Sequence, residues 1–331
     1  MFGIDILGTG AYTPAIPVTN EDLAGIVETN DEWISTRTGI KTRHISDGEP
    51  TWKMGAEAAK GALAAAGIDS SEIGLIIDTT ITSDFSTPSM ACVIQGEIGA
   101  KNAAAFDLNA ACSGFVYGVD AAQRYLRTDP ELEYVLVIAN EQLSRITDYT
   151  DRATCVLFGD GAAAAVITRS EKLYTSFIGA DGTGSKYLYS KTHRVYHPFR
   201  TNDTDQIDIG DFAAGTDFLI QDGKEVYKFA TKALPTATEK AAAKVGLDIS
   251  EIDWFVPHQA NMRIIETAAK NLGVSIDKFI VNIKDHGNTS SASIPIALHE
   301  AIASGQIKRG DKICLVGFGA GLTMAAIIME Y

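Results

Sequence analysis

The segment Gly67-Ile-Asp-Ser-Ser-Glu-Ile-Gly-Leu-Ile-Ile77 returns later in the chain as Gly246-Leu-Asp-Ile-Ser-Glu-Ile-Asp-Trp-Phe-Val256, at an offset of 179 residues. Each copy follows an alanine-rich helical stretch, and its glycine is suited to end that helix because glycine accepts a positive φ. Each copy then runs into a short apolar strand. Chance can produce eleven similar positions, so the order of the elements that follow has to decide whether the chain is duplicated.

The elements after the two copies do follow one order: helix, strand, small-residue loop, helix, strand, strand. Apart from the helix that each small-residue loop opens, the expected segments are 89–98, 104–108, 109–113, 134–139 and 162–168 in the first half, and 262–272, 279–283, 284–291, 312–316 and 324–329 in the second. Strands that alternate with helices predict parallel sheets covered by helices on both faces. Two such halves packed together predict a duplicated α/β fold with five layers, α/β/α/β/α.

The repeat divides the chain into a first half at residues 1–178 and a second half at 217–331. Residues 179–216 lie between them and do not follow the pattern. Their Gly-Thr-Gly, scattered tyrosines and polar Thr-Asn-Asp-Thr-Asp run fit a lid or an interface loop, and a solvated insertion fits as well.

The composition narrows the function classes. With 331 residues, 46% apolar and 21% charged, the chain is long enough for one large or two ordinary domains and is neither disordered nor fibrous. A formal charge of −14 disfavours nucleic acid and anionic membranes as bulk partners. No apolar run approaches the roughly 20 residues of a membrane-spanning helix, and no secretory signal is visible, so we expect a cytoplasmic protein.

Cys112 is the candidate nucleophile among four cysteines that form no CxxC pair. It lies in Asn109-Ala-Ala-Cys-Ser-Gly-Phe115, where a strand ends and a helix starts at about Ser113. The free N–H groups and the dipole of a helix start favour a thiolate over a thiol. Small neighbours allow a substrate to approach. The other three, Cys92, Cys155 and Cys314, are expected to be small buried hydrophobes.

His258 and Asn288 are the candidate partners. His258 directly follows a strand of the second half, and α/β sites form at strand ends. Alone, such a histidine is more often structural, and an asparagine in a loop before a helix is usually a cap. In the repeat, however, the loop of Asn288 is the counterpart of the loop of Cys112. Pseudo-twofold symmetry would therefore bring all three side chains together.

Three motifs, Asn-Ala-Ala-Cys-Ser-Gly-Phe, Pro-His-Gln-Ala-Asn and Gly-Asn-Thr-Ser-Ser-Ala-Ser, together resemble the thiolase superfamily and, more closely, the β-ketoacyl-acyl-carrier-protein synthase III family. The resemblance implies a thiolase-like fold, a homodimer and an acyltransferase that initiates fatty-acid synthesis. Its reaction would condense an acyl-coenzyme A, expected to be acetyl, with malonyl-acyl carrier protein, releasing CO₂ and coenzyme A. Cys112 would accept the acyl group, and His258 and Asn288 would complete the triad. No metal or redox cofactor is expected, because decarboxylation generates the carbanion and coenzyme A thioester is a substrate.

The same resemblance implies further site residues. The oxyanion would be held by the backbone N–H groups of Cys112 and Ala320. Coenzyme A would be bound by Trp33, Arg37, Arg152 and Asn261. The carrier protein would contact Gln259, Ala260, Asn261, Met262, Arg263, Lys228 and Lys270. Thr87 falls where some relatives place a bulky aromatic residue, which suggests a wider acyl pocket. Trp33 could instead be a core or interface aromatic residue, the arginines surface ion pairs, and the basic residues a solvated helix face.

Two other functions are compatible with these motifs. A related acyltransferase of secondary metabolism would keep the triad but not need the carrier protein. A non-catalytic subunit of a heterodimeric synthase would typically have lost the cysteine, so the presence of Cys112 disfavours it.

Overall fold

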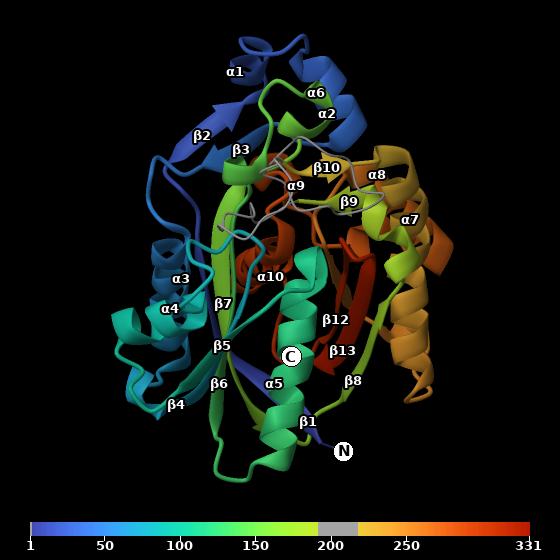
Figure 1. Cartoon of the computed structure of the whole chain (residues 1–331). Coiled ribbons are helices and arrows are strands. Elements are labelled where there is room, and N and C mark those ends of the chain that lie inside the picture. Colours follow the sequence, from blue (N-terminus) through green and yellow to red (C-terminus); the bar gives the residue numbers. More distant parts are fainter. Residues whose placement is uncertain (1, 191–217) are drawn as a thin grey trace, which may run out of the picture.

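Two sheets with helices between and outside them form the body of the protein (Figure 1), a computed structural model that describes residues 2–190 and 218–331. In this part of the chain the first sheet has the strand order β1-β7-β6-β4-β5, and the second has the order β11-β12-β13-β8. The first sheet contains β1 (Gly3–Tyr12), β4 (Ile73–Thr79), β5 (Ala104–Leu108), β6 (Tyr134–Gln142) and β7 (Asp160–Ser170). The second contains β8 (Tyr174–Ala180), β11 (Trp254–Pro257), β12 (Lys312–Gly319) and β13 (Thr323–Glu330).

Helices and two small hairpins complete the described elements. The helices are α1 (Asn20–Ala24), α2 (Asp31–Thr38), α3 (Thr51–Ala66), α4 (Met90–Ile98), α5 (Gly114–Thr128), α6 (Arg152–Cys155), α7 (Gly223–Ala243), α8 (Met262–Leu272), α9 (Ile283–His286) and α10 (Ser293–Ala303). The short strands are β2 (Ile16–Thr19) paired with β3 (Thr42–Ile45), and β9 (Leu188–Tyr189) paired with β10 (Ile220–Gln221). No helix among the described residues is long and apolar enough to span a membrane.

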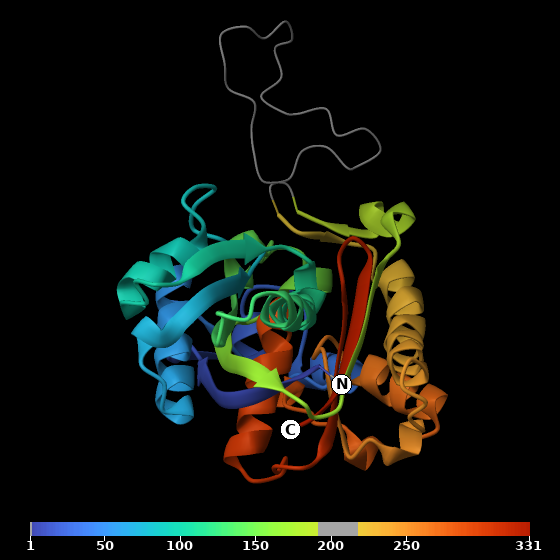
Figure 2. The ribbon, with the colours of Figure 1, turned by 90° about the horizontal axis from the view of Figure 1, so that it is seen from below.

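Figure 2 shows the five predicted layers edge-on. Helices α3 and α4 cover the outer face of the first sheet, α7 and α8 cover the outer face of the second, and α5 and α10 lie between the sheets. The middle layer is the largest apolar core: Phe115 of α5 and Ile294 of α10 are fully buried against both sheets. Burial of such side chains contributes about 25 cal/mol per Å² of apolar surface, so this layer holds the two halves together. The predicted five-layer α/β fold is confirmed.

The two halves repeat each other strand by strand. Strands β8, β13, β12 and β11 stand in the same order as β1, β7, β6 and β4. Gly67 and Gly246 both follow a helix with positive φ, 67° and 66°. A short 3₁₀ turn comes next in each half, and each is capped by an aspartate, Asp69 or Asp248, in a reciprocal capping box. The offset of 179 residues seen in the sequence is therefore a structural repeat.

The sheets differ from the prediction because they are mixed rather than parallel. β4 is parallel to β5 and β6, but β7 runs antiparallel to both β1 and β6. β13 is likewise antiparallel to β12 and β8. The sequence analysis missed β1 and β8, the strands that start each half. Because β8 pairs with β13, the second sheet takes residues 174–180, across the proposed boundary at residue 178. Residues 191–216 of the predicted excursion lie outside the described residues.

The prediction of a strand at residues 279–283 is also wrong. Only Phe279 makes an isolated bridge, to Phe255, and α9 begins at Ile283. The reason is the buried side chain of Gln259. Its Oε1 accepts hydrogen bonds from the backbone N–H groups of Asn282 and Ile283, both at 3.2 Å, and its Nε2 donates to the carbonyl of Ile280 at 3.1 Å. These backbone groups are thus satisfied by a side chain, and no strand ladder forms.

Candidate active site

Cys112 lies in a single 3₁₀ turn, Ala111–Ser113, between the end of β5 and the start of α5. The turn opens with Ala111 at φ 48°, held by a hydrogen bond from its N–H to Asn109 Oδ1 at 3.2 Å. Gly114 then lets α5 pass close to the second half, since a Cβ there would lie 3.2 Å from Cβ of Ser291. The local sequence therefore places the sulfur where the two halves meet.

The Cys112 thiol differs from the predicted thiolate. Burial raises its pKa to about 12, and the contact of Sγ with Ser290 Oγ, 3.5 Å away, lowers it by less. The start of α5 favours the thiolate but lies two residues further along the chain. The residue is therefore a thiol at neutral pH, and its proton needs an acceptor when the sulfur attacks.

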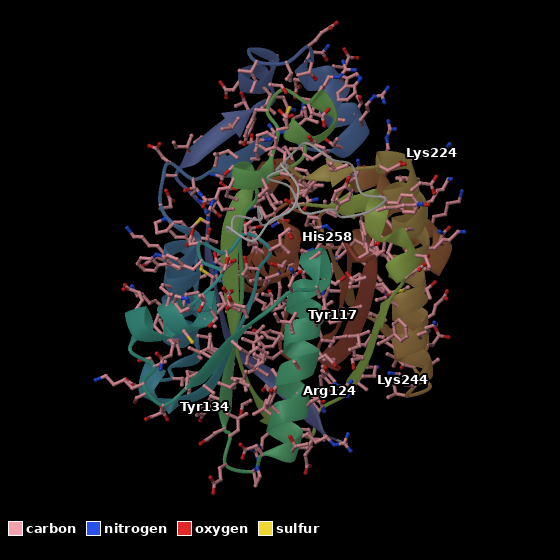
Figure 3. The ribbon with its side chains drawn as sticks, in the orientation of Figure 1. Tyr117, Arg124, Tyr134, Lys224, Lys244 and His258 are labelled. Carbon is pink, nitrogen blue, oxygen red and sulfur yellow. The ribbon has the colours of Figure 1, made fainter. Side chains whose placement is uncertain are left out.

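His258 follows β11, and its backbone N–H donates to Val316 O at 2.8 Å, which continues the pairing with β12. The ring is almost fully buried, edge-on to Phe318 at 5.2 Å between centroids, and its Nδ1 lies 2.7 Å from Ser293 Oγ. Burial lowers the pKa of His258 to about 3. The imidazole is therefore neutral at physiological pH, and only one of its two nitrogens carries a proton. Figure 3 shows it near the centre of the molecule, between the halves.

Asn288 lies in the second-half loop, joined to the first half by backbone hydrogen bonds to Leu157 and Gly159. Its Oδ1 accepts from the N–H of Ser290 at 2.9 Å. This bond fixes the orientation of the carboxamide, and within the described chain it leaves the Nδ2 group free to donate. The asparagine thus serves both as a turn cap and as an available donor.

One cavity of about 1370 Å³ brings the predicted triad together: Cys112, His258 and Asn288 all line it. Ala320 lines the same cavity, next to Gly319. A Cβ on Gly319 would lie 2.6 Å from the backbone nitrogen of Cys112, so glycine is needed for this close approach. Cys112 and Ala320, the predicted oxyanion-hole residues, therefore lie close together and line the same cavity.

Trp33 and Arg37 of α2 also line the cavity, whereas Arg152 does not. The guanidinium carbons of Arg37 and Arg152 each lie 4.8 Å from the Trp33 ring centroid. A base stacked between two planes needs about 7 Å, two van der Waals contacts of about 3.5 Å. Arg152 therefore has to swing outward before an adenine can stack on Trp33. Asn261 lines the cavity and also caps α8 by accepting from the N–H of Arg263.

The predicted carrier-protein residues fall into two groups. Ala260, Asn261, Arg263 and Lys228 line the cavity, and Lys270 is exposed on the same helix as Arg263. Gln259 has no exposed surface, because it hydrogen-bonds the backbone of the 280–283 loop, so its prediction as a contact is wrong. Met262 is partly buried, and its Cβ packs against Gly39.

Two further residues lie in other surroundings than expected, and the wider acyl pocket suggested by Thr87 stays a prediction. Thr87 is exposed and does not line the cavity of a single chain, although Phe85 and Ser86 of the same loop do. Cys92 is exposed on α4, whereas Cys155 and Cys314 are buried as expected.

The sequence analysis missed Glu141, Ser290 and Ser293, which surround the triad without belonging to it. Glu141 is fully buried at the end of β6, in the run Ala-Asn-Glu-Gln. A charged residue at the end of an apolar strand was a usable signal, because strand ends are where α/β sites form.

Comparison with known proteins shows which family this chain resembles. Residues 106–182 match the family model 3-oxoacyl-[acyl-carrier-protein] synthase III, and residues 242–331 match the model of its C-terminal part. The chain is 46% identical over 333 residues to a β-ketoacyl-[acyl-carrier-protein] synthase III of Clostridium acetobutylicum, covering 100% of this chain and 99% of that protein. It is 47% identical to a protein of the same name from Oceanobacillus iheyensis, covering 99% of each.

Solved structures agree with this. The crystal structure of 3-oxoacyl-[acyl-carrier-protein] synthase III from Aquifex aeolicus superposes with a TM-score of 0.90 at 41% identity, covering 99% of this chain and all of that one. A priming β-ketosynthase of the R1128 polyketide pathway superposes with a TM-score of 0.88 at 35% identity, covering 99% and 96%.

Proposed function

This chain belongs to the β-ketoacyl-acyl-carrier-protein synthase III family, and we propose that its cavity joins the acyl group of an acyl-coenzyme A to malonyl-acyl carrier protein. The chain is an acyltransferase, a condensing enzyme that initiates fatty-acid synthesis. The observation that carries the assignment of residues is that Cys112, His258 and Asn288, drawn from both halves, line one cavity.

In the first stage the sulfur of Cys112 attacks the thioester carbon and coenzyme A leaves. The developing oxyanion would accept hydrogen bonds from the N–H groups of Cys112 and Ala320, because donors fixed by the backbone stabilise such a charge best. The acyl chain would lie against the apolar wall of the cavity, formed by Ile81, Leu143, Phe158 and Leu219.

In the second stage the malonyl group loses CO₂, and its thioester oxygen becomes an enolate. The Nδ2 group of Asn288 and the protonated ring nitrogen of neutral His258 supply two donors to that oxygen. Ser293 can set the required tautomer. Its Oγ accepts from the N–H of Gln259 at 3.3 Å, so its own proton is free for Nδ1 of His258, which leaves Nε2 protonated. The carbanion then attacks the acyl-cysteine, giving 3-oxoacyl-carrier protein.

The mouth of the cavity fits anionic substrates despite the net charge of −14. Arg37, Lys224 and Arg263 line it, and Lys224 stands at the outer end of α7 in Figure 3. Such a local basic patch complements the phosphates of coenzyme A and the acidic surface of a carrier protein. We propose Trp33, Arg37, Arg152 and Asn261 for coenzyme A, and Ala260, Met262, Arg263, Lys228 and Lys270 for the carrier protein. No bound cofactor enters the proposal.

The protein is proposed to act as a cytoplasmic homodimer. Supporting this, β5 is the edge of the first sheet in the described chain, and an edge strand offers free backbone groups to a second copy. Light scattering during gel filtration measures the state, and a monomer at micromolar concentration would contradict it.

A reconstituted condensation assay tests the function. Acyl-enzyme is measured by mass spectrometry after mixing with acetyl-, isobutyryl- or octanoyl-coenzyme A, and 3-oxoacyl product is measured after adding malonyl-carrier protein. We expect product only with the carrier protein present. Equal turnover without it would point to the related acyltransferase of secondary metabolism. Exclusive use of the acetyl donor would contradict the wider pocket proposed from Thr87.

A further inference from the structure

The buried carboxylate of Glu141 is separated from the Cys112 sulfur by a single side chain, that of Ser290, and does not line the cavity. Glu141, at the end of β6, has no exposed surface and is absent from the cavity lining. The mechanism above gives it no role. Burying an ionised carboxylate is costly, so its surroundings have to account for its presence.

Both oxygens of Glu141 are held by donors. Oε1 accepts from Ser290 Oγ and from Ser291 Oγ, each at 2.9 Å. Oε2 accepts from Thr82 Oγ1 at 2.7 Å and from the N–H of Ile81 at 3.1 Å. The carboxylate of the first half is therefore bonded directly to the turn of the second half that opposes Cys112.

Ser290 connects this carboxylate to the nucleophile. Its hydroxyl has one proton, and that proton is donated to Glu141. Its lone pairs are therefore left for Cys112, whose Sγ lies 3.5 Å from Ser290 Oγ with the thiol as donor. The result is a continuous path of hydrogen bonds from sulfur to hydroxyl to carboxylate, with every donor pointing toward Glu141.

Ser291 allows the carboxylate to receive a proton. Its Oγ lies within hydrogen-bond distance of two acceptors, Glu141 Oε1 and the carbonyl of Thr79 at 2.8 Å, but has only one proton. When Glu141 is ionised, Ser291 can donate to it. When Glu141 is protonated, it can donate to Ser291, which then donates to Thr79. Both states of Glu141 are thus satisfied without moving a heavy atom.

We propose that the Cys112 thiol loses its proton through Ser290 to Glu141 during acyl transfer. The S–H proton moves to Ser290 Oγ while the Ser290 proton moves to Glu141 Oε1, and the electron pair left on Sγ forms the bond to the thioester carbon. Ser290 ends as a hydroxyl and Glu141 as a carboxylic acid, while the carbonyl electron pair moves to the oxygen. When that pair returns, the bond from the carbon to the coenzyme A sulfur breaks. The proton goes back from Glu141 through Ser290 to that sulfur, so coenzyme A leaves as a thiol and no co-reactant is consumed. Glu141 acts through Ser290 and is therefore a positioning residue. The step rests on the proposed function, but the protonation of Cys112 can be measured without substrate.

The ionisable groups around this path favour proton transfer to Glu141. Burial raises the pKa of Glu141 above its usual range, and four hydrogen bonds oppose that rise, so the group is a better proton acceptor than an exposed carboxylate. Asp78 of β4 interacts electrostatically with Glu141, and its own pKa is raised by burial first and by Asp107 and Glu141 next. His258 is a titratable side chain that lines the same cavity as Cys112, and the experiment below tests its contribution with a variant of its own.

The experiment measures alkylation of Cys112 by iodoacetamide between pH 5 and 9, read on the Cys112 peptide by mass spectrometry. Transfer to Glu141 keeps the proton inside the protein, so the thiolate fraction does not depend on pH over part of this range. We expect a pH-independent shelf in the alkylation rate of the wild type. In Glu141→Gln and Ser290→Ala the shelf should disappear, and the rate should rise about tenfold per pH unit because the proton then has to reach solvent. Exposed Cys92 in the same digest controls for the reagent.

Two variants make the test specific. Thr80→Val removes a hydrogen bond of 3.4 Å to the other carboxylate oxygen, Oε2, away from Ser290 and from the cavity lining, so it should keep the shelf. His258→Ala should also keep it. Ser290→Ala is compatible with the backbone, because Ala111 adopts φ 48° at the counterpart of Ser290, φ 50°. Acyl-enzyme formation at pH 7 should fall about 100-fold in Glu141→Gln and Ser290→Ala, the usual size of a lost proton-transfer group, and less than about threefold in Thr80→Val.

Three outcomes would overturn the proposal: no shelf in the wild type, a shelf retained in both Glu141→Gln and Ser290→Ala, or a shelf lost in His258→Ala alone. A wild type that condenses substrates without a shelf would contradict only this path. A shelf in a wild type that forms no product would support the path and contradict the proposed function.

Discussion

The turns at residues 109–113 and 288–292 have the same backbone in the two halves but different chemistry. Each opens with an asparagine, Asn109 or Asn288, whose side chain accepts from the N–H two residues later. That second residue has φ 48° in one turn and 50° in the other. The next position is Cys112 in the first half and Ser291 in the second, again 179 residues apart. Only the cysteine lines the cavity.

The difference comes from the strand end that each turn meets in the opposite half. Glu141 of β6 contacts the second turn, and Gly319 of β12, its counterpart by strand register, contacts the first. The Glu141 carboxylate accepts a hydrogen bond from the Ser291 hydroxyl. Gly319 has no side chain, so it leaves the N–H of Cys112 open to a substrate. Duplication thus provides two equivalent helix starts, and one side chain at each strand end decides which of them can be a nucleophile.

Cys112→Ser makes the two turns carry the same residue and should have the largest effect. A serine hydroxyl is a far weaker nucleophile, so condensation should fall by at least about 10⁴-fold. Mass spectrometry after mixing with acyl-coenzyme A should detect no acyl-enzyme. In the converse control, Ser291→Cys, the introduced thiol should resist iodoacetamide, because Ser291 has no exposed surface. Acylation at position 291 in this variant would contradict the claim that only the first turn can carry a nucleophile.

Gly319→Ala should block access to the backbone of the first turn, because it adds a side chain at the position that Glu141 has in the other half. The added Cβ would lie 2.6 Å from the nitrogen of Cys112, so the oxyanion donor has to move. Acyl-enzyme formation should fall by about 10² to 10³-fold, the usual cost of losing such a donor. Gly317→Ala is the matched control, since its Cβ would lie no closer than 3.4 Å to the backbone of Cys112. Its nearest neighbour, 3.1 Å away, is Cδ1 of Ile294, the end of a side chain that can shift. Similar losses in both variants would show that the effect is not local to that N–H group.

Asn288→Ala and Asn109→Ala separate the structural role that the two asparagines share from the catalytic one that they do not. Each variant loses one turn hydrogen bond, worth about 1 kcal/mol of folding free energy, so their melting temperatures should fall alike. Condensation should fall about 100-fold in Asn288→Ala, which loses a donor to the enolate, and by no more than about tenfold in Asn109→Ala. Acyl-enzyme formation should survive in both. Equal loss of condensation would contradict the assignment of Asn288.

His258 gives the second half a pH dependence that the first half lacks, since its counterpart, 179 residues earlier, is Thr79. The pKa of His258 is about 3 in the folded protein, below the unfolded value of 6.5. Between these values the unfolded chain binds the proton and the folded protein does not. The contribution of His258 to the free energy of unfolding is therefore intact above pH 6.5 and is lost as the pH falls, by about 1.4 kcal/mol per unit.

Urea denaturation at pH 5 and pH 7 measures this effect, with His258→Gln as the variant that cannot titrate there. The wild type should lose more stability than the variant between the two pH values. Equal losses would show that the imidazole is charged or exposed in the folded protein.

The repeat, the elements around it and the triad could be predicted because they depend on local signals. The glycine that ends each helix, the apolar strand after it and the small-residue turn are short-range patterns, and the structure places their bounds within a few residues for most elements. The strands β1 and β8 were missed because their direction is set by pairing with β7 and β13, distant in sequence. The strand at 279–283 failed because one buried side chain, Gln259, took its backbone partners.

By itself, the sequence determined that the chain is duplicated, that its layers alternate, and that a cysteine, a histidine and an asparagine stand at strand and helix ends. Only the tertiary structure decided how these residues behave. It buried the thiol so that its pKa rises, kept the imidazole neutral, and set Ser290 and Glu141 of opposite halves in line with the sulfur. The physical reason is that protonation and hydrogen bonding depend on solvent exclusion and on neighbours within about 3 Å, and these neighbours are brought together across 149 to 178 positions of the chain.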